Sequence, residues 1–497
     1  MAFGGDAVSS EMAILVAMTL PLVGMILVAL TGKNPNLRET VTLLTGIATF
    51  GVVLTILPDV MAGGQPEVVV ATILPGLALA FKVEPLGMLF ALVASGLWIV
   101  TSVYAIGYMR GHHEENQTRF FAFFAFAISA ALGVAFARNM FTLFIMYEVL
   151  TFSTYPLVTH HRTEDAKRGG RIYMGILVST SVSFLLLAMI WTWHLTGTLE
   201  FTAGGILSGK ASEGVLMVLL GLYAFGAGKA ALMPFHKWLP SAMVAPTPVS
   251  ALLHAVAVVK AGVFTVMKVV IYVFGTDLLS KTGLSDWLIY VAGATILIAS
   301  LVAMTKDNLK ARLAYSTISQ LSYIVLGAAL ANDLGILGGG LHIVTHAFGK
   351  ITLFFCAGAI LVALHKTDIS DMKGIGRQMP FTMFAFLIGS LSIIGLPPFA
   401  GAWSKWYLVL GAMEAHHYVV TGILLVSSLL NIYYLLPIVV NAFFASAPKD
   451  DHHHEGLHEA PILCVIPLLF TATGCLVLFL FPDPVLDLLK LIGGSGP

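Results

Sequence analysis

The chain has 497 residues, of which 58% are hydrophobic and only 10% charged, and its formal net charge is zero. A soluble domain carries about 25% charged residues and could not hide so much apolar surface in one core. The composition therefore excludes a soluble enzyme and predicts an all-α polytopic membrane protein. A net charge of zero favours no class of binding partner.

Apolar segments that could cross a bilayer recur along the whole chain. A spanning helix needs about 20 mainly apolar residues. Residues 12–30 are expected to form a first spanning helix, because no Ala-x-Ala cleavage site follows them. Fourteen spans are predicted, at residues 10–30, 38–58, 82–108, 119–137, 139–160, 172–197, 213–232, 248–275, 284–304, 308–330, 335–364, 382–412, 419–445 and 460–482.

Lysine and arginine in the short loops predict how the chain is oriented. Loops after even-numbered spans carry only Arg138, Lys210 and Lys281. Cytoplasmic loops hold an excess of these residues, so we predict a prokaryotic plasma-membrane protein with both termini on the non-cytoplasmic side. Loops after odd-numbered spans carry Lys33, Arg110, Arg162, Lys167, Arg168, Lys237, Lys306, Lys366, Lys373, Arg377 and Lys449.

Ionisable residues lie inside the predicted spans, where a charged side chain that faces lipid costs roughly 2.5–3.5 kcal/mol at the bilayer centre. Such residues usually face a bundle interior and belong to ion pathways. Glu148, in LFIMYEVLTF, is the acid of this set. The full set is Glu148, Lys229, His254, Lys260, Lys310, His342, His346, Lys350 and Lys405.

These residue types suit proton transfer. Desolvation lowers the pKa of a lysine and a nearby carboxylate raises it, so moving or protonating the carboxylate switches the lysine. Glu148 and Lys229 are expected to form such a pair. His342, His346 and Lys350 follow i, i+4, i+8 spacing, which places them on one face of a helix over about two turns. The alternative is that these histidines only pack the core.

The helices that carry Lys229 and Lys405 are predicted to be broken. Several prolines follow Lys229 in MPFHKWLPSAMVAPTPVS, and IIGLPPFAGAW precedes Lys405. Interrupted helices at matching places in two halves indicate inverted repeats. The predicted divisions are 1–118 (helices 1–3), 119–275 (first repeat, helices 4–8), 284–445 (second repeat, helices 9–13) and 446–497 (a cytoplasmic His-rich loop and helix 14).

Four stretches in this order are similar to one family. GKAALMPFHKWLPSAMVAPTPVSALLHAVAVVKAG, NLKARLAYSTISQLSYIVLG, LHIVTHAFGKITLFF and LPPFAGAWSKW resemble the antiporter-like subunits of respiratory complex I and of Mrp-type cation/proton antiporters. GYMRGHHEENQTRFFAFFAF resembles the D-type subunits of Mrp antiporters. The resemblance implies fourteen helices, inverted repeats, broken helices 7 and 12, and roles in proton transfer for all nine residues named above.

The leading functional hypothesis is therefore a proton-translocating subunit of a multisubunit Na⁺ or K⁺/proton antiporter, with other membrane subunits as partners. The same module in a redox-driven complex, such as complex I or a membrane-bound hydrogenase, is the alternative. No cofactor, nucleic-acid or metal site is expected in this chain, and any redox chemistry would belong to partners. A third hypothesis is a structural subunit whose charges only hold helices together. The polar stretch PKDDHHHEGLHE, residues 448–459, is expected to be a solvated loop, with transition-metal binding as its alternative.

Overall fold

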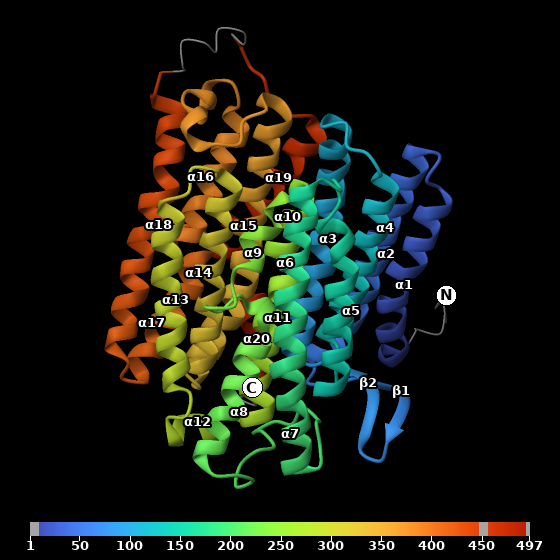
Figure 1. Ribbon diagram of the computed structural model, residues 1–497, viewed down its shortest axis with the longest axis vertical. Helices are drawn as coiled ribbons and strands as arrows, with labels where there is room; N and C mark the ends of the chain where they lie inside the picture. Colours follow the sequence, from blue (N-terminus) through green and yellow to red (C-terminus); the bar gives the residue numbers. More distant parts are fainter. Residues whose placement is uncertain (1–8, 447–455, 494–497) are drawn as a thin grey trace, which may run out of the picture.

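The computed structural model describes residues 9–446 and 456–493, except the side chains of residues 253 and 254. Helices run along the long axis of the molecule, with α1 and α2 on one side and α17 and α18 on the other (Figure 1). The predicted His-rich loop lies mostly outside the described residues. Ten helical segments in the described part of the chain are long and apolar enough to cross a membrane: α1 (Ser10–Leu30), α2 (Pro35–Met61), α3 (Pro85–Gly111), α4 (Gln117–Ala135), α5 (Met140–Val158), α6 with α7 (Glu164–Thr196), α13 (Asp286–Met304), α15 (Asp333–Leu364), α18 (Tyr418–Phe444) and α19 (Ile462–Leu480).

The predicted count of fourteen spans is not confirmed, although each predicted range overlaps a helix. An eleventh span is reached if Val258–Phe274 and Thr276–Thr282, which meet at 82°, are counted as one. The difference arises because several predicted spans are interrupted or polar. The remaining helices are α8 (Glu213–Gly226), α9 (Trp238–Ser241), α10 (Thr247–Ala251), α11 (Val258–Lys268), α12 (Thr276–Thr282), α14 (Leu309–Ala329), α16 (Pro380–Ile394), α17 (Gly401–Glu414) and α20 (Asp483–Lys490).

Asparagine caps begin three helices that carry predicted site residues. The side chains of Asn139, Asn308 and Asn332 accept hydrogen bonds from backbone N–H groups at the starts of α5, α14 and α15, at 2.9, 3.1 and 2.8 Å. Such caps satisfy donors that the first helical turn leaves unpaired. The caps therefore fix where each of these helices starts.

The predicted breaks beside Lys229 and Lys405 are confirmed. α8 ends at Gly226, and Lys229 lies in the 3₁₀ turn Gly228–Ala230. α16 ends at Ile394 and α17 begins at Gly401. Proline cannot donate a backbone hydrogen bond, which explains why no continuous helix forms through either segment.

α15 occupies the centre of the bundle. It packs against α14, α16, α17 and α19, and also against α3. Its glycines permit close approach: a Cβ at Gly338 would meet the backbone nitrogen of Leu408 on α17. A helix buried on most sides positions its polar residues away from lipid.

A two-stranded antiparallel sheet is a departure from the all-α prediction. β1 (Glu67–Leu74) pairs with β2 (Leu77–Lys82) around the turn at Pro75 and Gly76. The hairpin lies below the lower ends of α1 and α5 (Figure 1). Its Pro-Gly dipeptide and its β-branched run VVVATI are the signals that sequence analysis passed over.

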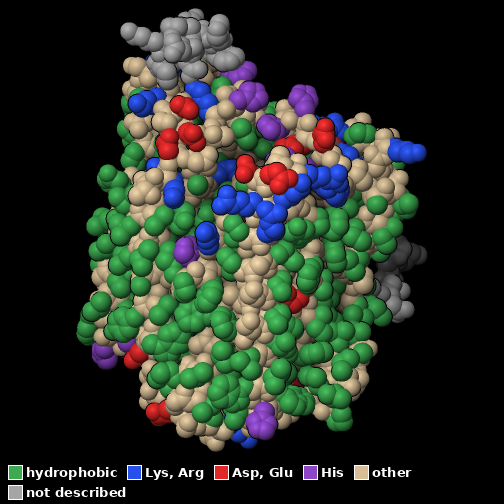
Figure 2. Space-filling model, viewed as in Figure 1, with side chains coloured by type: hydrophobic (Ala, Val, Ile, Leu, Met, Phe, Trp, Pro, Cys, Tyr) green, Lys and Arg blue, Asp and Glu red, His purple; other side chains and the backbone are tan. Residues whose placement is uncertain are grey.

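The surface divides into an apolar band and a charged end. Figure 2 shows lysine, arginine, acidic and histidine side chains gathered at the upper end, above a band of hydrophobic side chains. Large apolar residues such as Leu44, Ile190 and Leu429 are exposed on the outside of the bundle. A contiguous exposed apolar surface of this kind indicates contact with lipid or with other membrane subunits. We call the upper end the loop face.

Candidate functional site

Lys229 is fully buried and held by α5. Its Nζ donates to the carbonyl of Tyr147 at 2.9 Å and to Oγ1 of Thr151 at 2.5 Å. The same nitrogen lies 3.2 Å from the centroid of the Tyr147 ring. Gly262 on α11 makes this packing possible, because a Cβ there would meet the backbone of Lys229 and Ala230.

Glu148 is the neighbour of Tyr147, the residue that holds Lys229, and its charge acts on Lys229 through space rather than through direct contact. In the described contacts its carboxylate forms no hydrogen bond or ion pair with Lys229, whose head group binds Tyr147 and Thr151 instead. Its Oε1 is buried and has no hydrogen-bond partner among the described residues. Burying a carboxylate oxygen without a partner is costly, so a functional reason for Glu148 is favoured.

Lys260 and the two histidines of α15 come together at the centre of the bundle. Nζ of Lys260 lies 2.8 Å from Nδ1 of His346. The rings of His346 and His342 are 5.8 Å apart, and Nδ1 of His342 lies 2.8 Å from Oγ of Ser404. All three titratable residues are at most 2% exposed.

Lys405 continues this line on α17, directly after Ser404. Its Nζ donates to the carbonyl of Ile394 at 2.9 Å and to Oγ of Ser428 at 3.1 Å. The ring of Tyr323 contacts both His342 and Lys405. It stacks on the His342 ring with 5.4 Å between the centroids, and its centroid lies 4.8 Å from Nζ of Lys405. The sequence analysis missed Tyr323, whose role depends on contacts between three helices.

Lys350 lies on α15 with the two histidines but turns toward α14. Its Nζ donates to Oγ of Ser316 at 2.5 Å, and the hydroxyl of Ser316 donates to the Tyr434 oxygen at 2.8 Å. Tyr434 donates in turn to Asn431. Lys350 therefore begins a hydrogen-bonded side branch rather than the direct line from His346 to Lys405.

Two predicted residues stand apart from this group. Lys310 lies in the first turn of α14, and its Nζ donates to the carbonyl of Ala245 at 2.6 Å. His254 falls in the π-helical turn Leu252–Val256, but its side chain lies outside the described part of the structure.

Sequence analysis also missed a buried ion pair. Glu84, just before α3, accepts from Nζ of Lys268 on α11 at 2.6 Å, and both side chains are at most 4% exposed. Lys268 also lies 4.3 Å from the Phe201 ring. Glu84 lies near the start of the predicted span 82–108, where a charge is ordinary, but Lys268 lies inside the apolar run of the predicted span 248–275 and could have been singled out there. The pairing itself joins residues 184 positions apart, so the sequence alone gave no sign of it.

Lys260, His346, His342 and Lys405 form a row of buried groups, and the turn that carries Lys229 packs against α11, the helix of Lys260. We call these five residues the central row: Lys229, Lys260, His346, His342 and Lys405. Lysine, imidazole and hydroxyl groups can each donate a hydrogen bond, and neutral imidazole and hydroxyls can also accept one. Imidazole accepts and releases protons near neutral pH. The arrangement has the chemical requirements of a proton relay. Among the described residues, no group of three or more His, Cys, Asp or Glu side chains could hold a metal ion.

Comparisons with known proteins show the family of the chain. The family described as "NADH:quinone oxidoreductase/Mrp antiporter, TM" matches residues 137–431, and "NADH-Ubiquinone oxidoreductase (complex I), chain 5 N-terminus" matches residues 76–121. NADH-quinone oxidoreductase subunit N of Desulforudis audaxviator is 32% identical over 427 residues, covering 83% of this chain and 84% of the relative. The probable A/B subunit of a K(+)/H(+) antiporter of Rhizobium meliloti is 30% identical over 82% of this chain and 40% of the relative.

Among solved structures, a chain of the Mrp complex from Dietzia sp. DQ12-45-1b superposes with a TM-score of 0.86 at 21% identity, covering 98% of this chain and 97% of that one. At this identity the likeness shows the fold alone. It confirms the predicted multi-helix fold. The assignment to the D type of Mrp subunits stays a prediction. Because the matched region exceeds half of the chain, this protein belongs to the NADH:quinone oxidoreductase/Mrp antiporter family of membrane subunits.

Proposed function

We propose that this chain is the proton-translocating subunit of a multisubunit Na⁺ or K⁺/proton antiporter and works alongside other membrane subunits. The central row is the observation that carries the proposal. It holds titratable side chains from α11, α15 and α17 and the turn before α9, all buried away from lipid. Ionisable residues inside a membrane are expensive and are retained mainly for function.

In this proposal a proton travels between two terminal lysines. Lys229 ends the first half, next to Glu148, and Lys405 ends the second half. Lys260, His346 and His342 connect them, through the 2.8 Å contacts on either side of the histidine pair. A negative charge on Glu148 stabilises a protonated Lys229, and loss of that charge releases the proton along the row.

The redox-driven alternative is supported by the relatives that are subunits of NADH-quinone oxidoreductase. The antiporter reading is supported by the relative whose name assigns it to a K(+)/H(+) antiporter. The two readings differ in their partners: other membrane subunits alone for the antiporter, and hydrophilic redox subunits for the alternative. Identifying the proteins that purify with this chain distinguishes them.

For orientation, we propose that the loop face is cytoplasmic and that both termini lie on the other side. The gathering of lysine and arginine at that face supports this arrangement (Figure 2). Labelling of a single cysteine introduced at Lys33, between α1 and α2, by a membrane-impermeant reagent would test it in intact cells.

Glu148→Gln tests the proposed function. Gln keeps the size of the side chain but cannot carry its charge, so the change should abolish proton movement driven by a Na⁺ or K⁺ gradient while the complex still assembles. Proton movement into vesicles is followed with a pH-sensitive dye. Glu213→Gln, at the exposed first position of α8, is the matched control. Near-wild-type exchange by an assembled Glu148→Gln complex would falsify a role for Glu148 in the relay.

A further inference from the structure

Outside the central row, three histidines converge on one buried carboxylate at the loop face. Glu114 lies between α3 and α4, and its side chain is only 5% exposed. Nε2 of His161 lies 3.1 Å from each oxygen of Glu114. His112 lies 3.0 Å away through Nδ1 and His160 3.8 Å away through Nε2. Residues 112–116 and 160–163 line a hollow that opens this group to water.

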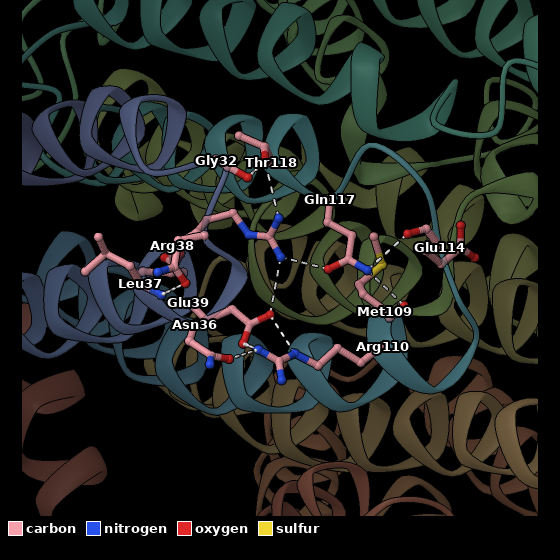
Figure 3. Close-up of polar contacts among 12 residues, drawn as sticks. Gly32, Asn36, Leu37, Arg38, Glu39, Met109, Arg110, Glu114, Gln117 and Thr118 are labelled. Carbon is pink, nitrogen blue, oxygen red and sulfur yellow. Dashed lines mark hydrogen bonds and ion pairs between the residues drawn. The ribbon is translucent and has the colours of Figure 1, made fainter.

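A separate polar network holds the loop that carries Glu114 (Figure 3). Gln117 donates through Nε2 to the carbonyls of Glu114 and Met109, at 3.0 and 3.2 Å. Its Oε1 accepts from Arg38 at 2.8 Å. Arg38 and Arg110 both contact the Glu39 carboxylate, so α2 and α3 are tied to this loop. The carboxylate is thus presented to His161 by a fixed backbone.

The hydrogen bonds of His161 imply that His161 and Glu114 share one proton in addition to the hydrogen on Nδ1. Its Nδ1 faces the carbonyl of Val244 at 3.2 Å, and a carbonyl can only accept, so Nδ1 carries hydrogen. Nε2 then faces the Glu114 carboxylate, and a hydrogen bond there requires one further proton on either group. Without that proton, the Nε2 lone pair and the carboxylate oxygens repel each other.

The same histidine leads toward Lys310. Val244, which accepts from His161, is followed by Ala245, whose carbonyl accepts from Lys310. Further along α14, Leu313 and Ser316 accept from Lys350, about one and about two turns from Lys310. Lys310, which stands apart from the central row, therefore lies between the loop face and the side branch of Lys350.

We propose that Glu114 and His161 form a proton-collecting site, which takes protons from water at the loop face and delivers them toward Lys310. The inference rests on the proposed function and gives Lys310 a place in it. A hydronium ion gives its proton to Nε2 and leaves as water. The hydrogen on Nδ1 then passes, through water beside the Val244 and Ala245 carbonyls, to a Lys310 that has already given up its own proton. The His161 ring, 35% exposed, turns over to restore its first form.

The electrostatics of the cluster support this assignment. Burial acts to raise the pKa of Glu114, but hydrogen bonds and charges from His161 and His112 outweigh it and the pKa is lowered. The hydrogen bond to Glu114 raises the pKa of His161. Burial lowers the pKa of His160 to about 4, so His160 is uncharged at neutral pH. The other titratable or charged groups around this cluster are Tyr108, His113, Glu115, Arg119, Arg162, Lys310 and His365.

The test compares Glu114→Gln and His161→Gln with Glu115→Gln, in vesicles that contain the assembled complex. Glu115 is exposed in the same loop, which makes it a matched control. At alkaline pH on the loop face, where free protons are scarce, the first two variants should exchange severalfold more slowly than wild type. Adding imidazole buffer on that face should restore most of the rate, because the buffer replaces the collector. Glu115→Gln should behave as wild type.

Equal rates in Glu114→Gln, His161→Gln and Glu115→Gln would overturn the proposal, as would a loss that is the same at every pH and that imidazole does not restore. Such a loss would show a structural role. If the wild-type complex exchanges no protons, the proposed function fails separately, and the site is then judged by titrating His161 with NMR. Its midpoint should lie above that of a free histidine, about 6.5, and fall toward that value in Glu114→Gln. An unchanged midpoint would rule the site out.

Discussion

At the residue scale, the two terminal lysines share one kind of environment. Lys229 lies over the ring of Tyr147 and Lys405 over the ring of Tyr323. Cation–π contacts contribute about 2 kcal/mol or more when desolvated, which helps a buried ammonium group to remain charged. Neither lysine depends on a salt bridge in the described contacts, so each can lose its proton without leaving a bound carboxylate unpaired.

The residue types of the candidate site could be predicted from the sequence, but their partners could not. A carboxylate or lysine inside an apolar run stands out by itself. The direction in which a long lysine side chain points depends on packing between helices distant in sequence. Packing between helices therefore determines that Lys229 donates to Tyr147 and Thr151 rather than to Glu148. It also determines that Lys350 donates to Ser316.

His342 and His346 are predicted to act as one unit. His346 contacts Lys260 and His342 contacts Ser404, so the route passes through both rings. His342→Gln or His346→Gln should each slow exchange without ending it, since Gln can still hold a water molecule. The double variant should lose far more than the product of the two single effects. Exchange rates of the three variants are compared at several pH values.

Losses that simply multiply, with an unaltered pH dependence, would mean that the two histidines only pack the core. A Ser322→Ala variant, which changes a buried polar residue of α14 without touching either ring in the described contacts, is a suitable control.

The pH dependence of stability is a second consequence of His161. Its raised pKa means that its contact with Glu114 stabilises the fold fully below the ordinary histidine pKa and is lost as pH rises through the raised value. The lowered pKa of Glu114 means that its contribution is present above the ordinary carboxyl pKa and is lost as pH falls through the lowered value. His161→Gln should therefore lower the Tm of the complex at about pH 5.5 and have little effect at about pH 9. An equal loss of Tm at both pH values would contradict this window.

At the scale of the elements, helix ends and breaks could be read from the sequence. Asparagine caps and proline-glycine runs act locally, so the starts of α5, α14 and α15 and the breaks beside Lys229 and Lys405 are encoded within a few residues. The β1–β2 hairpin was missed because a search for long apolar helices gives no weight to a short strand pair. The pairing of Glu84 with Lys268 was missed because it joins α3 to α11 across 184 residues.

The Glu84–Lys268 pair predicts a stability experiment. Glu84→Leu leaves the Lys268 ammonium buried without its carboxylate, which costs about 3–5 kcal/mol for buried pairs. The side chain of Glu84 forms no capping hydrogen bond on α3, so the substitution does not also destabilise the start of that helix. The double variant Glu84→Leu/Lys268→Met should recover most of the loss, because no buried charge remains. Thermal melting of the purified complex measures the stability of the single and of the double variant.

Asp277→Asn breaks the exposed pair with Lys281 and should leave the melting temperature nearly unchanged. A double variant as unstable as Glu84→Leu would show that the loss comes from poor packing at position 84 rather than from the unpaired lysine.

At the scale of the whole molecule, the central row connects two similar halves. Each half has a lysine beside a helix break and a tyrosine beneath it, and α15 lies between them with its two histidines. This likeness supports the proposed inverted repeats at 119–275 and 284–445. The central claim is that the central row is a serial relay, in which every residue must transfer the proton.

Proton movement in vesicles that contain Lys229→Ala or Lys405→Ala complexes tests this claim most directly. Lys210→Ala, at an exposed loop position, serves as the control. A serial relay predicts that each of the two variants, one in each half, stops cation-driven proton movement while the control keeps the wild-type rate. A wild-type rate in either assembled variant would contradict the relay, because protons would then cross without one of its terminal lysines.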